Sequence, residues 1–250
     1  MRTFIPQRRV DTCTETWEAA YRRFETPEQE IEKFVRRLRG LGADTWPRNS
    51  RIAEIFCGRG NGLHALTRLG FSNVVGIDLS PRLLQLYCDA AKTVVGDCRA
   101  LPWEPACKDV VVVQGGLHHL DSHQDLERVL QEAARVLVPG GRFVLVEPWL
   151  TPFLGGVHAL SFSPLRRLSN KLDAFATMTE HEHRTYERWL QSPNEILAAL
   201  QREFRQQQPR PCWRVRFGGR GDHRVDQRCG GIRPELVGQS LNKLWDGVPG

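Results

Sequence analysis

The sequence predicts an α/β fold built on a doubly wound, mostly parallel sheet, with helices before the first strand and an irregular C-terminal tail. Three observations lead to this prediction. Five short apolar segments alternate with stretches of helical periodicity between residues 51 and 147, which is typical of parallel sheets. The first segment runs into a glycine-rich turn, and the second and fifth end in an acidic residue. Because ligands of such sheets bind at the carboxyl ends of the strands, we expect the functional site there.

The stretch that organises the chain is residues 51–63, RIAEIFCGRGNGL. It begins as a buried strand and continues with glycines at 58, 60 and 62, which allow backbone to approach a ligand closely. Residues 63–69 then predict a short helix that Gly70 ends. A strand, a glycine turn and a helix hold nucleotide-like ligands in many parallel sheets. The alternative is an ordinary βα turn that is rich in glycine.

The other strands follow in order along the chain. We expect them at residues 73–78, 93–96, 108–114 and 142–147. The second strand ends at Asp78, where a carboxylate can accept hydrogen bonds from both hydroxyls of a ribose. The fourth is an unbroken β-branched run, which is typical of a strand buried on both faces. The clearest helical periodicity covers 126–137, and Pro139-Gly140-Gly141 ends it.

The segments on either side of this core are less regular. Residues 1–46 predict a helical cap with two amphipathic helices, the second opened by a capping box of Thr26 and Gln29. This cap either covers the ligand cleft as a lid or packs on the sheet edge. Residues 148–191 predict turns and short helices, and a further helix follows to residue 204. Residues 205–250, rich in Gly, Pro and Arg, predict an irregular tail in which only 212–217 resembles a strand.

Composition limits the function classes. The net charge is +6, and the segment from Arg202 onward carries +5 of it, with ten Lys or Arg against five Asp or Glu. Such a tail could touch nucleic acid or acidic lipid, or be merely solvated. The seven cysteines are odd in number and form no CxxC pair, which argues against disulfides and zinc and for the cytoplasm. We expect neither a membrane span nor a secretory signal.

The spacing of the glycines argues against a dinucleotide-binding dehydrogenase. That fingerprint is G-x-G-x-x-G, which places a pyrophosphate at a helix N-terminus. Here the spacing is Gly58-x-Gly60-x-Gly62, and Glu54 precedes it. A carboxylate is unfavourable beside a pyrophosphate, so Glu54 indicates a ligand with an amine or another positive group.

With these motifs, residues 51–147 resemble a class I S-adenosylmethionine-dependent methyltransferase, within it the methyltransferase type 11 group, whose sheet is Rossmann-like. The motifs that carry the resemblance are Glu54–Gly60, Asp78, Gly96-Asp97-Cys98 with Ala100-Leu101-Pro102, Gln114–Leu120 with its His118-His119-Leu120, and the helix end before the strand to Glu147. They cover about two-fifths of the chain. One residue departs from the pattern, because Phe56 stands where most members have the first glycine.

The resemblance implies S-adenosylmethionine as cofactor and a role for each matching residue. Glu54 would lie near the methionine end and Gln114 at the sulfonium. Asp78 would hold the ribose, and Asp97 with the backbone of Cys98 would bind adenine. For the acids, the alternative is that they cap the following helices. The full expected cofactor site is Glu54, Phe56, Cys57, Gly58, Gly60, Asp78, Leu79, Asp97, Cys98 and Gln114.

The expected reaction is an in-line displacement at the sulfonium methyl, to which the protein contributes alignment and desolvation. His118 or His119 could act as base, the alternative being a structural turn histidine. The Asn/Asp-Pro-Pro-aromatic element of amino-group DNA methyltransferases is missing after the fourth strand, and so is a nucleophilic cysteine. No cluster of His and carboxylates suggests a metal.

A small-molecule acceptor is therefore expected, and the apolar, aromatic segment 149–178 favours a lipid- or quinone-like one. The methyltransferase domain would span 47–204, with core 51–147 and acceptor-side segment 148–191. A nucleic-acid partner is not expected, and RNA or protein is the alternative acceptor class. The alternative function is a non-catalytic module that binds the cofactor, or nucleic acid through the basic tail 205–250.

Overall fold

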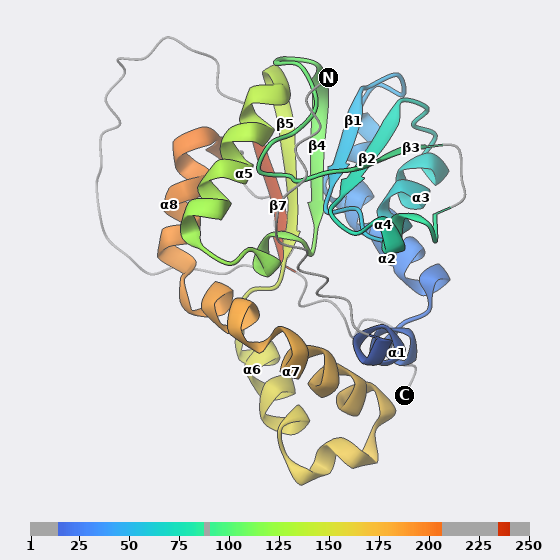
Figure 1. Cartoon of the computed structure of the whole chain (residues 1–250), viewed down its shortest axis with the longest axis vertical. Coiled ribbons are helices and arrows are strands. Elements are labelled where there is room, and N and C mark those ends of the chain that lie inside the picture. Colours follow the sequence, from blue (N-terminus) through green and yellow to red (C-terminus); the bar gives the residue numbers. More distant parts are fainter. Residues whose placement is uncertain (1–14, 88–90, 207–234, 241–250) are drawn as a thin grey trace.

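The computed structural model describes residues 15–87, 91–206 and 235–240. Its centre is one sheet in which every strand pairing is parallel, in the order β3-β2-β1-β4-β5-β7-β6 (Figure 1). The strands are β1 Ile52–Ile55, β2 Val74–Asp78, β3 Lys92–Val95, β4 Lys108–Gln114, β5 Leu137–Glu147, β6 Arg205–Gln206 and β7 Glu235–Ser240. The predicted doubly wound sheet is confirmed, and its order reverses between β1 and β4. Ligands bind at such a reversal.

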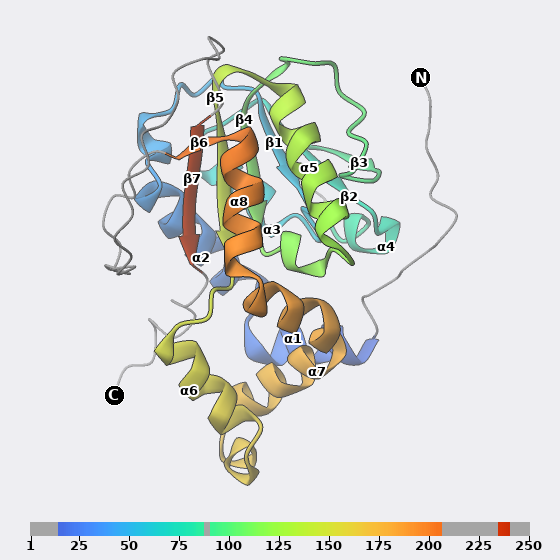
Figure 2. The same ribbon diagram turned by 90° about the vertical axis from the view of Figure 1, so that its left-hand side faces the viewer.

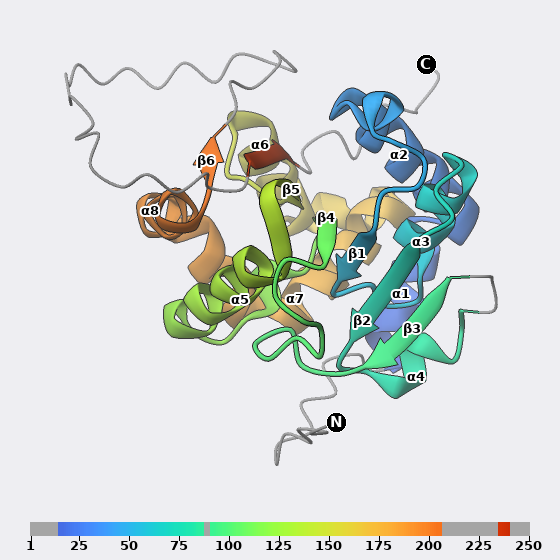
Figure 3. The same cartoon turned by 90° about the horizontal axis from the view of Figure 1, so that it is seen from above.

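Helices cover both faces of the sheet (Figure 3). Helices α2 and α3 lie on one face, and α5 and α8 lie on the other. The helices are α1 Glu15–Phe24, α2 Pro27–Gly40, α3 Asn61–Arg68, α4 Pro81–Leu84, α5 His123–Val136, α6 Pro152–Ser161, α7 Asn170–Gln191 and α8 Pro193–Glu203, with 3₁₀ turns η1 Ala43–Thr45, η2 Leu117–His119 and η3 Pro164–Leu168. The capping box before α2 is confirmed, since Gln29 N–H donates to Thr26 Oγ1 and Thr26 N–H donates to Gln29 Oε1.

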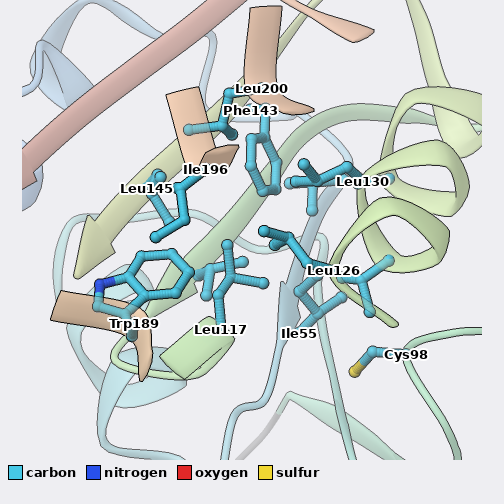
Figure 4. Packing of buried hydrophobic residues seen from close by; sticks show 14 of the residues in the cluster. Ile55, Cys98, Leu117, Leu126, Leu130, Phe143, Leu145, Trp189, Ile196 and Leu200 are labelled. Carbon is cyan, nitrogen blue, oxygen red and sulfur yellow. The ribbon is translucent and has the colours of Figure 1, made fainter. Parts of the chain in front are cut away.

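The core divides between the two faces as strand alternation requires. In β4, Val111 and Val113 belong to the cluster under α5 and α8, whereas Val110 and Val112 belong to the cluster under α2 and α3. The first cluster continues through Phe143, Ile196 and Leu200 to the indole of Trp189, which faces Leu117 (Figure 4). Alternate burial of one apolar run therefore fixes the sheet between two helical layers.

Helices α1, α6 and α7 lie beyond the carboxyl ends of the strands (Figures 1 and 2). There α1 packs against α7, with the rings of Phe24 and Phe175 6.2 Å apart. Helix α2 instead packs against α3. The two N-terminal helices thus separate: α1 lies at the strand ends, where a lid would lie, and α2 covers a sheet face.

Segment 148–191 differs from its prediction of turns and short helices, because it contains α6 and the 22-residue α7. Helix α7 packs in turn against α1, α6, η2, η3 and α8, so its buried side chains form no single periodic stripe. The N-terminal end of this segment is tied down by Trp189, whose Nε1 donates to the carbonyl of Pro148 at 2.8 Å. Contacts far apart in the chain, rather than local periodicity, produce this region.

Other helices and strands also differ from their predicted positions. Strands β6 and β7 come from the tail that we expected to be irregular, and the strand-like stretch 212–217 lies outside the described residues. Helix α4 is a short helix that ends at Leu84. Strand β5 begins at Leu137, within the expected helix and before its glycine stop. In the part of the chain that the structure describes, no helix has the length and apolar character to cross a bilayer.

Candidate functional site

The glycine turn after β1 is held in place by the acid that ends β2. Gly58 and Gly60 have φ values of +52° and +82°, which favour glycine, and Gly60 caps α3. Gly58 N–H donates to Asp78 Oδ2 at 2.8 Å, and Ser80 N–H donates to Asp78 Oδ1 at 2.9 Å. Burial raises the pKa of Asp78, although these hydrogen bonds lower it. Asp78 thus anchors the turn through backbone donors, and its carboxylate retains acceptor capacity for a ribose hydroxyl.

Glu54 and Gln114 lie side by side at the neighbouring strands β1 and β4. Gln114 Nε2 donates to Glu54 Oε1 at 3.1 Å. Among the described residues, Glu54 Oε2 and Gln114 Oε1 are buried without any hydrogen-bond partner. Glu54 is 2% exposed, and this burial raises its pKa to about 8 although Gln114 lowers it. Two buried acceptors without a donor are costly in a folded protein, which indicates a ligand that brings donors.

The third glycine of the turn makes room for this carboxylate. A Cβ at Gly62 would lie 1.8 Å from Glu54 Oε1, so only glycine fits at this position of α3. At Gly60, a Cβ would lie 2.1 Å from the ring of Tyr87. The alternate glycines therefore answer different requirements: backbone conformation at Gly58, close packing at Gly62, and both at Gly60.

Phe56 adopts the conformation that explains the usual glycine at its position. Its φ is +58°, in the left-handed region. A Cβ built on Gly116 would lie 2.4 Å from the Phe56 Cβ, so the missing side chain at Gly116 accommodates Phe56. Next to it, Cys57 Sγ faces the core, 2.7 Å from a Cβ built on Gly76. The backbone N–H and carbonyl of Cys57 bond to Ile77 and Gly60. Cys57 therefore shapes the turn through groups that are already engaged.

The adenine end of the predicted site holds an ion pair that the sequence did not indicate. Arg99 forms a bidentate pair with Asp97, at 2.7 Å for its closest contact, and its other branch reaches Asp125 at 3.0 Å. Asp97 is 9% exposed, so a donor from a ligand would share a carboxylate that Arg99 already occupies. Burial raises the pKa of the neighbouring Cys98 thiol. Leu79, 39% exposed, presents an apolar side chain directly after Asp78.

His118 is held by a carboxylate on the neighbouring strand. His118 Nδ1 lies 2.7 Å from Oε2 of Glu147, the last residue of β5. Glu147 Oε1 accepts from the N–H groups of Gly116 and Leu117, both at 2.7 Å. The ring of His119 lies 4.1 Å from that of His118. Glu147 therefore fixes the whole turn that follows β4.

Glu147 and Arg99 were not among the predicted site residues. Glu147 ends its strand as Asp78 ends β2, so the rule used for Asp78 would also have found it. A further contact joins α1 to the glycine turn, since the guanidinium of Arg59 lies 4.7 Å from the ring centre of Tyr21. Glu30 of α2 accepts from Asn61 at the first position of α3. Nothing in the spacing of these residues indicated such contacts.

These residues fit S-adenosylmethionine. Its ammonium group offers donors to the two unpartnered oxygens of Glu54 and Gln114. Its ribose matches Asp78 at the topological reversal, and the exposed Leu79 offers an apolar face to a base. The pairing of Asp97 with Arg99 is the one arrangement that the predicted roles did not include.

Comparison with known proteins agrees with this geometry. The sequence profile of the family described as "Methyltransferase domain" matches residues 53–145. The demethylmenaquinone methyltransferase of Thermus thermophilus is 28% identical over 178 residues, 57% of this chain and 80% of that protein. The tRNA (carboxymethyluridine(34)-5-O)-methyltransferase of Arabidopsis thaliana is 31% identical over 107 residues, 42% of this chain but only 26% of that protein.

Among solved structures, one from Pyrococcus horikoshii OT3 has a TM-score of 0.45 at 24% identity, covering 52% of this chain and 65% of the other. The family match runs from β1 into β5 as far as residue 145, and it includes the glycine turn, Asp78, Asp97 and Gln114. Its motifs lie where the sheet order reverses, as the cofactor of this family requires. Residues 53–145 therefore form a methyltransferase domain of the S-adenosylmethionine-dependent class.

Proposed function

We propose that this chain transfers the methyl group of S-adenosylmethionine to a small apolar acceptor by in-line displacement. When bound, the cofactor supplies a methyl group activated on a sulfonium, so the chain contributes alignment and exclusion of water. Glu54 and Gln114 hold the ammonium, and Asp78 holds the ribose. Asp97 shares its carboxylate between Arg99 and the adenine amino group.

The observation that carries the acceptor class is the character of the helices beyond the strand ends. Phe24 of α1 and Phe175 and Tyr186 of α7 are buried aromatic residues. Arg184 and Arg188, in the C-terminal half of α7, are engaged, because Arg184 pairs with Asp121 and Arg188 donates to the carbonyls of Leu120 and Asp121. Buried aromatic side chains beside two paired arginines favour a small apolar molecule over a nucleic acid, which requires free basic groups.

The His118–Glu147 pair supports a role for His118 as general base when the acceptor carries a hydroxyl. A ring whose Nδ1–H donates to Glu147 has Nε2 as its basic nitrogen, and Nε2 is the atom that would take the proton that the acceptor loses. The carboxylate fixes the tautomer and stabilises the imidazolium. His119, whose ring is tilted against that of His118, is the second candidate. An acceptor that loses no proton in the methyl-transfer step would need neither.

The relatives leave two acceptor classes to distinguish. The alignment with the demethylmenaquinone enzyme extends over 178 residues, whereas that with the tRNA enzyme covers 107 and only a quarter of its length. The longer alignment favours the small-molecule class. The alternative, a cofactor- or nucleic-acid-binding module that uses the basic tail, predicts nucleic-acid retention instead.

Calorimetry with S-adenosylmethionine tests the cofactor site. Asp78→Ala removes the ribose partner and the anchor of Gly58, so we expect affinity to fall by a factor of roughly 100. Absence of binding to the wild type, or equal binding by the variant, would refute the assignment. Incubation with methyl-labelled cofactor and separate lipid and RNA extracts then tests the acceptor. Label in the lipid fraction is expected, and label in RNA alone would overturn the small-molecule proposal.

A further inference from the structure

Helix α6 and the turn η3 project away from the sheet, at the end of the molecule where the strands carry the site (Figures 1 and 2). One face of α6 is anchored, since Leu154, Val157 and Ser161 are buried. His158 stacks on Phe175 of α7 at 5.6 Å between ring centres. The projection is therefore a fixed part of the fold with an outer face of its own. We call residues 159–171 the α6–η3 tip.

The outer face of α6 is apolar where a solvated helix would be polar. Its exposed positions are spaced as one helical stripe: Pro152, Gly156, Ala159 and Leu160. Leu160 is 46% exposed, and Phe162, directly after the helix, is 52% exposed. The helix contains no Asp, Glu, Lys or Arg. Two large apolar side chains exposed together at the end of a projection mark an interaction surface more than chance exposure does.

The charged side chains of the segment that carries this surface are all basic. Residues 148–172 include no Asp or Glu in 25 positions, but they include Arg166, Arg167 and Lys171. Arg166 is neutralised by Glu180 at 2.8 Å and by Asp173 at 3.6 Å. Arg167 and Lys171 are exposed. The α6–η3 tip therefore presents apolar side chains beside exposed cations on a segment without acids.

We propose that the α6–η3 tip docks on an anionic lipid bilayer. Leu160 and Phe162 enter the boundary between headgroups and acyl chains, while Arg167 and Lys171 contact lipid phosphates. Apolar side chains flanked by basic ones are what an interfacial anchor requires. The acid-free segment argues for this occupant over a protein partner, because protein surfaces generally offer both charge signs and a bilayer with acidic lipids offers one.

Docking in this way would turn the carboxyl ends of the strands toward the bilayer. Because α1 and α7 lie at that same end, an apolar acceptor could pass from lipid to the site without crossing water. This consequence deepens the proposed function and rests on it. The docking itself does not, since it depends only on the α6–η3 tip.

Sedimentation of the full chain with phosphatidylcholine vesicles, with and without phosphatidylglycerol, tests the proposal. Wild type is expected to bind the anionic vesicles and to bind more weakly as salt rises. Leu160→Ser/Phe162→Ser should weaken binding by roughly tenfold, and Arg167→Glu by roughly tenfold as well. Val95→Ser and Lys92→Glu are matched controls on the exposed strand β3, at the opposite edge of the sheet, and should bind as wild type does.

The basic tail is unchanged in all these variants, so it cannot account for a difference between them. Failure of wild type to bind, or equal binding by the Leu160/Phe162 variant, would overturn the docking proposal. Asp78→Ala separates the two proposals: it should lose the cofactor yet bind vesicles normally. Loss of vesicle binding in Asp78→Ala would instead show that the site, and not the tip, makes the contact.

Discussion

Two buried glutamates lie near the carboxyl ends of the central strands β1 and β5, and they differ in the number of hydrogen bonds that they accept. Glu54 of β1 is 2% exposed and Glu147 of β5 is 3% exposed. Glu147 receives three donors, from Gly116, Leu117 and His118. Glu54 receives one, from Gln114, and keeps a buried oxygen without a partner among the described residues. Equal burial thus accompanies a fully bonded carboxylate in one place and a partly bonded one in the other.

This difference indicates a structural role for Glu147 and a ligand-binding role for Glu54. Burying a charge is tolerated when hydrogen bonds satisfy it, as they do at Glu147. At Glu54 burial raises the pKa to about 8, because the hydrogen bond from Gln114 lowers it too little to offset the burial. Binding of a donor-bearing ligand would supply that compensation. The number of hydrogen-bond donors to each glutamate, rather than its burial, therefore distinguishes the ligand-binding carboxylate from the structural one.

The largest effect is expected at the bonded glutamate. Glu147→Ala leaves two buried N–H groups and the Nδ1 side of His118 without their acceptor, so the free energy of unfolding should fall by about 3 kcal/mol or more. Glu147→Gln retains an acceptor for the two N–H groups and should cost less. Urea unfolding at pH 7 without cofactor measures both. Glu54→Ala is the matched variant of equal burial, and a loss as large as that of Glu147→Ala would contradict the comparison.

The positions of the candidate cofactor-binding residues were largely predictable from the sequence because these residues lie within short motifs. Glu54, Gly58 and Asp78 lie at strand ends that periodicity locates, and the parallel sheet brings such ends together. The family match over 53–145 covers the same part. The role of Gly62 was not predictable, since it depends on where the Glu54 side chain lies against α3.

The secondary structure of the acceptor-side segment 148–191 was predicted less well because contacts between residues far apart in the chain determine it. Helix α7 was missed, since its buried side chains face several partners and show no single period. Trp189 bonds to Pro148, and His158 Nε2 lies 3.3 Å from the Tyr186 hydroxyl, pairs that no local spacing suggests. The Arg99–Asp97 pair was missed for a different reason. An arginine two residues after an acid is as common on a solvated surface as in a site.

Glu54→Gln tests the ligand-binding role that the comparison assigns to Glu54. We expect affinity for S-adenosylmethionine to fall roughly tenfold or more, because a charge-assisted hydrogen bond is lost. Since the folded pKa of about 8 lies above the usual value of 4.5, wild type should also release up to about one proton on binding between pH 5 and 8. Calorimetry in buffers of different ionisation enthalpy measures this release.

The same shift sets the pH dependence of stability without cofactor. The folded state holds the Glu54 proton up to about pH 8, whereas the unfolded chain loses it near 4.5, so stability contributed by this group falls as pH rises through that window. Glu54→Gln should flatten the profile and abolish the proton release. An unchanged release in the variant would assign the proton to another group.

An effect on stability smaller than that of Glu147→Ala is expected at Phe56 and Gly116, the contact that links the two glutamates. Phe56→Gly relieves a left-handed φ, worth about 1 kcal/mol, but loses the partly buried ring, so stability should change little. Gly116 has a φ of −120°, which alanine adopts freely, so Gly116→Ala should cost about 1–3 kcal/mol only through its contact with Phe56. In the Phe56→Gly background that cost should nearly vanish. If the two losses simply add in urea unfolding, Gly116 serves the turn held by Glu147 and not the packing of Phe56.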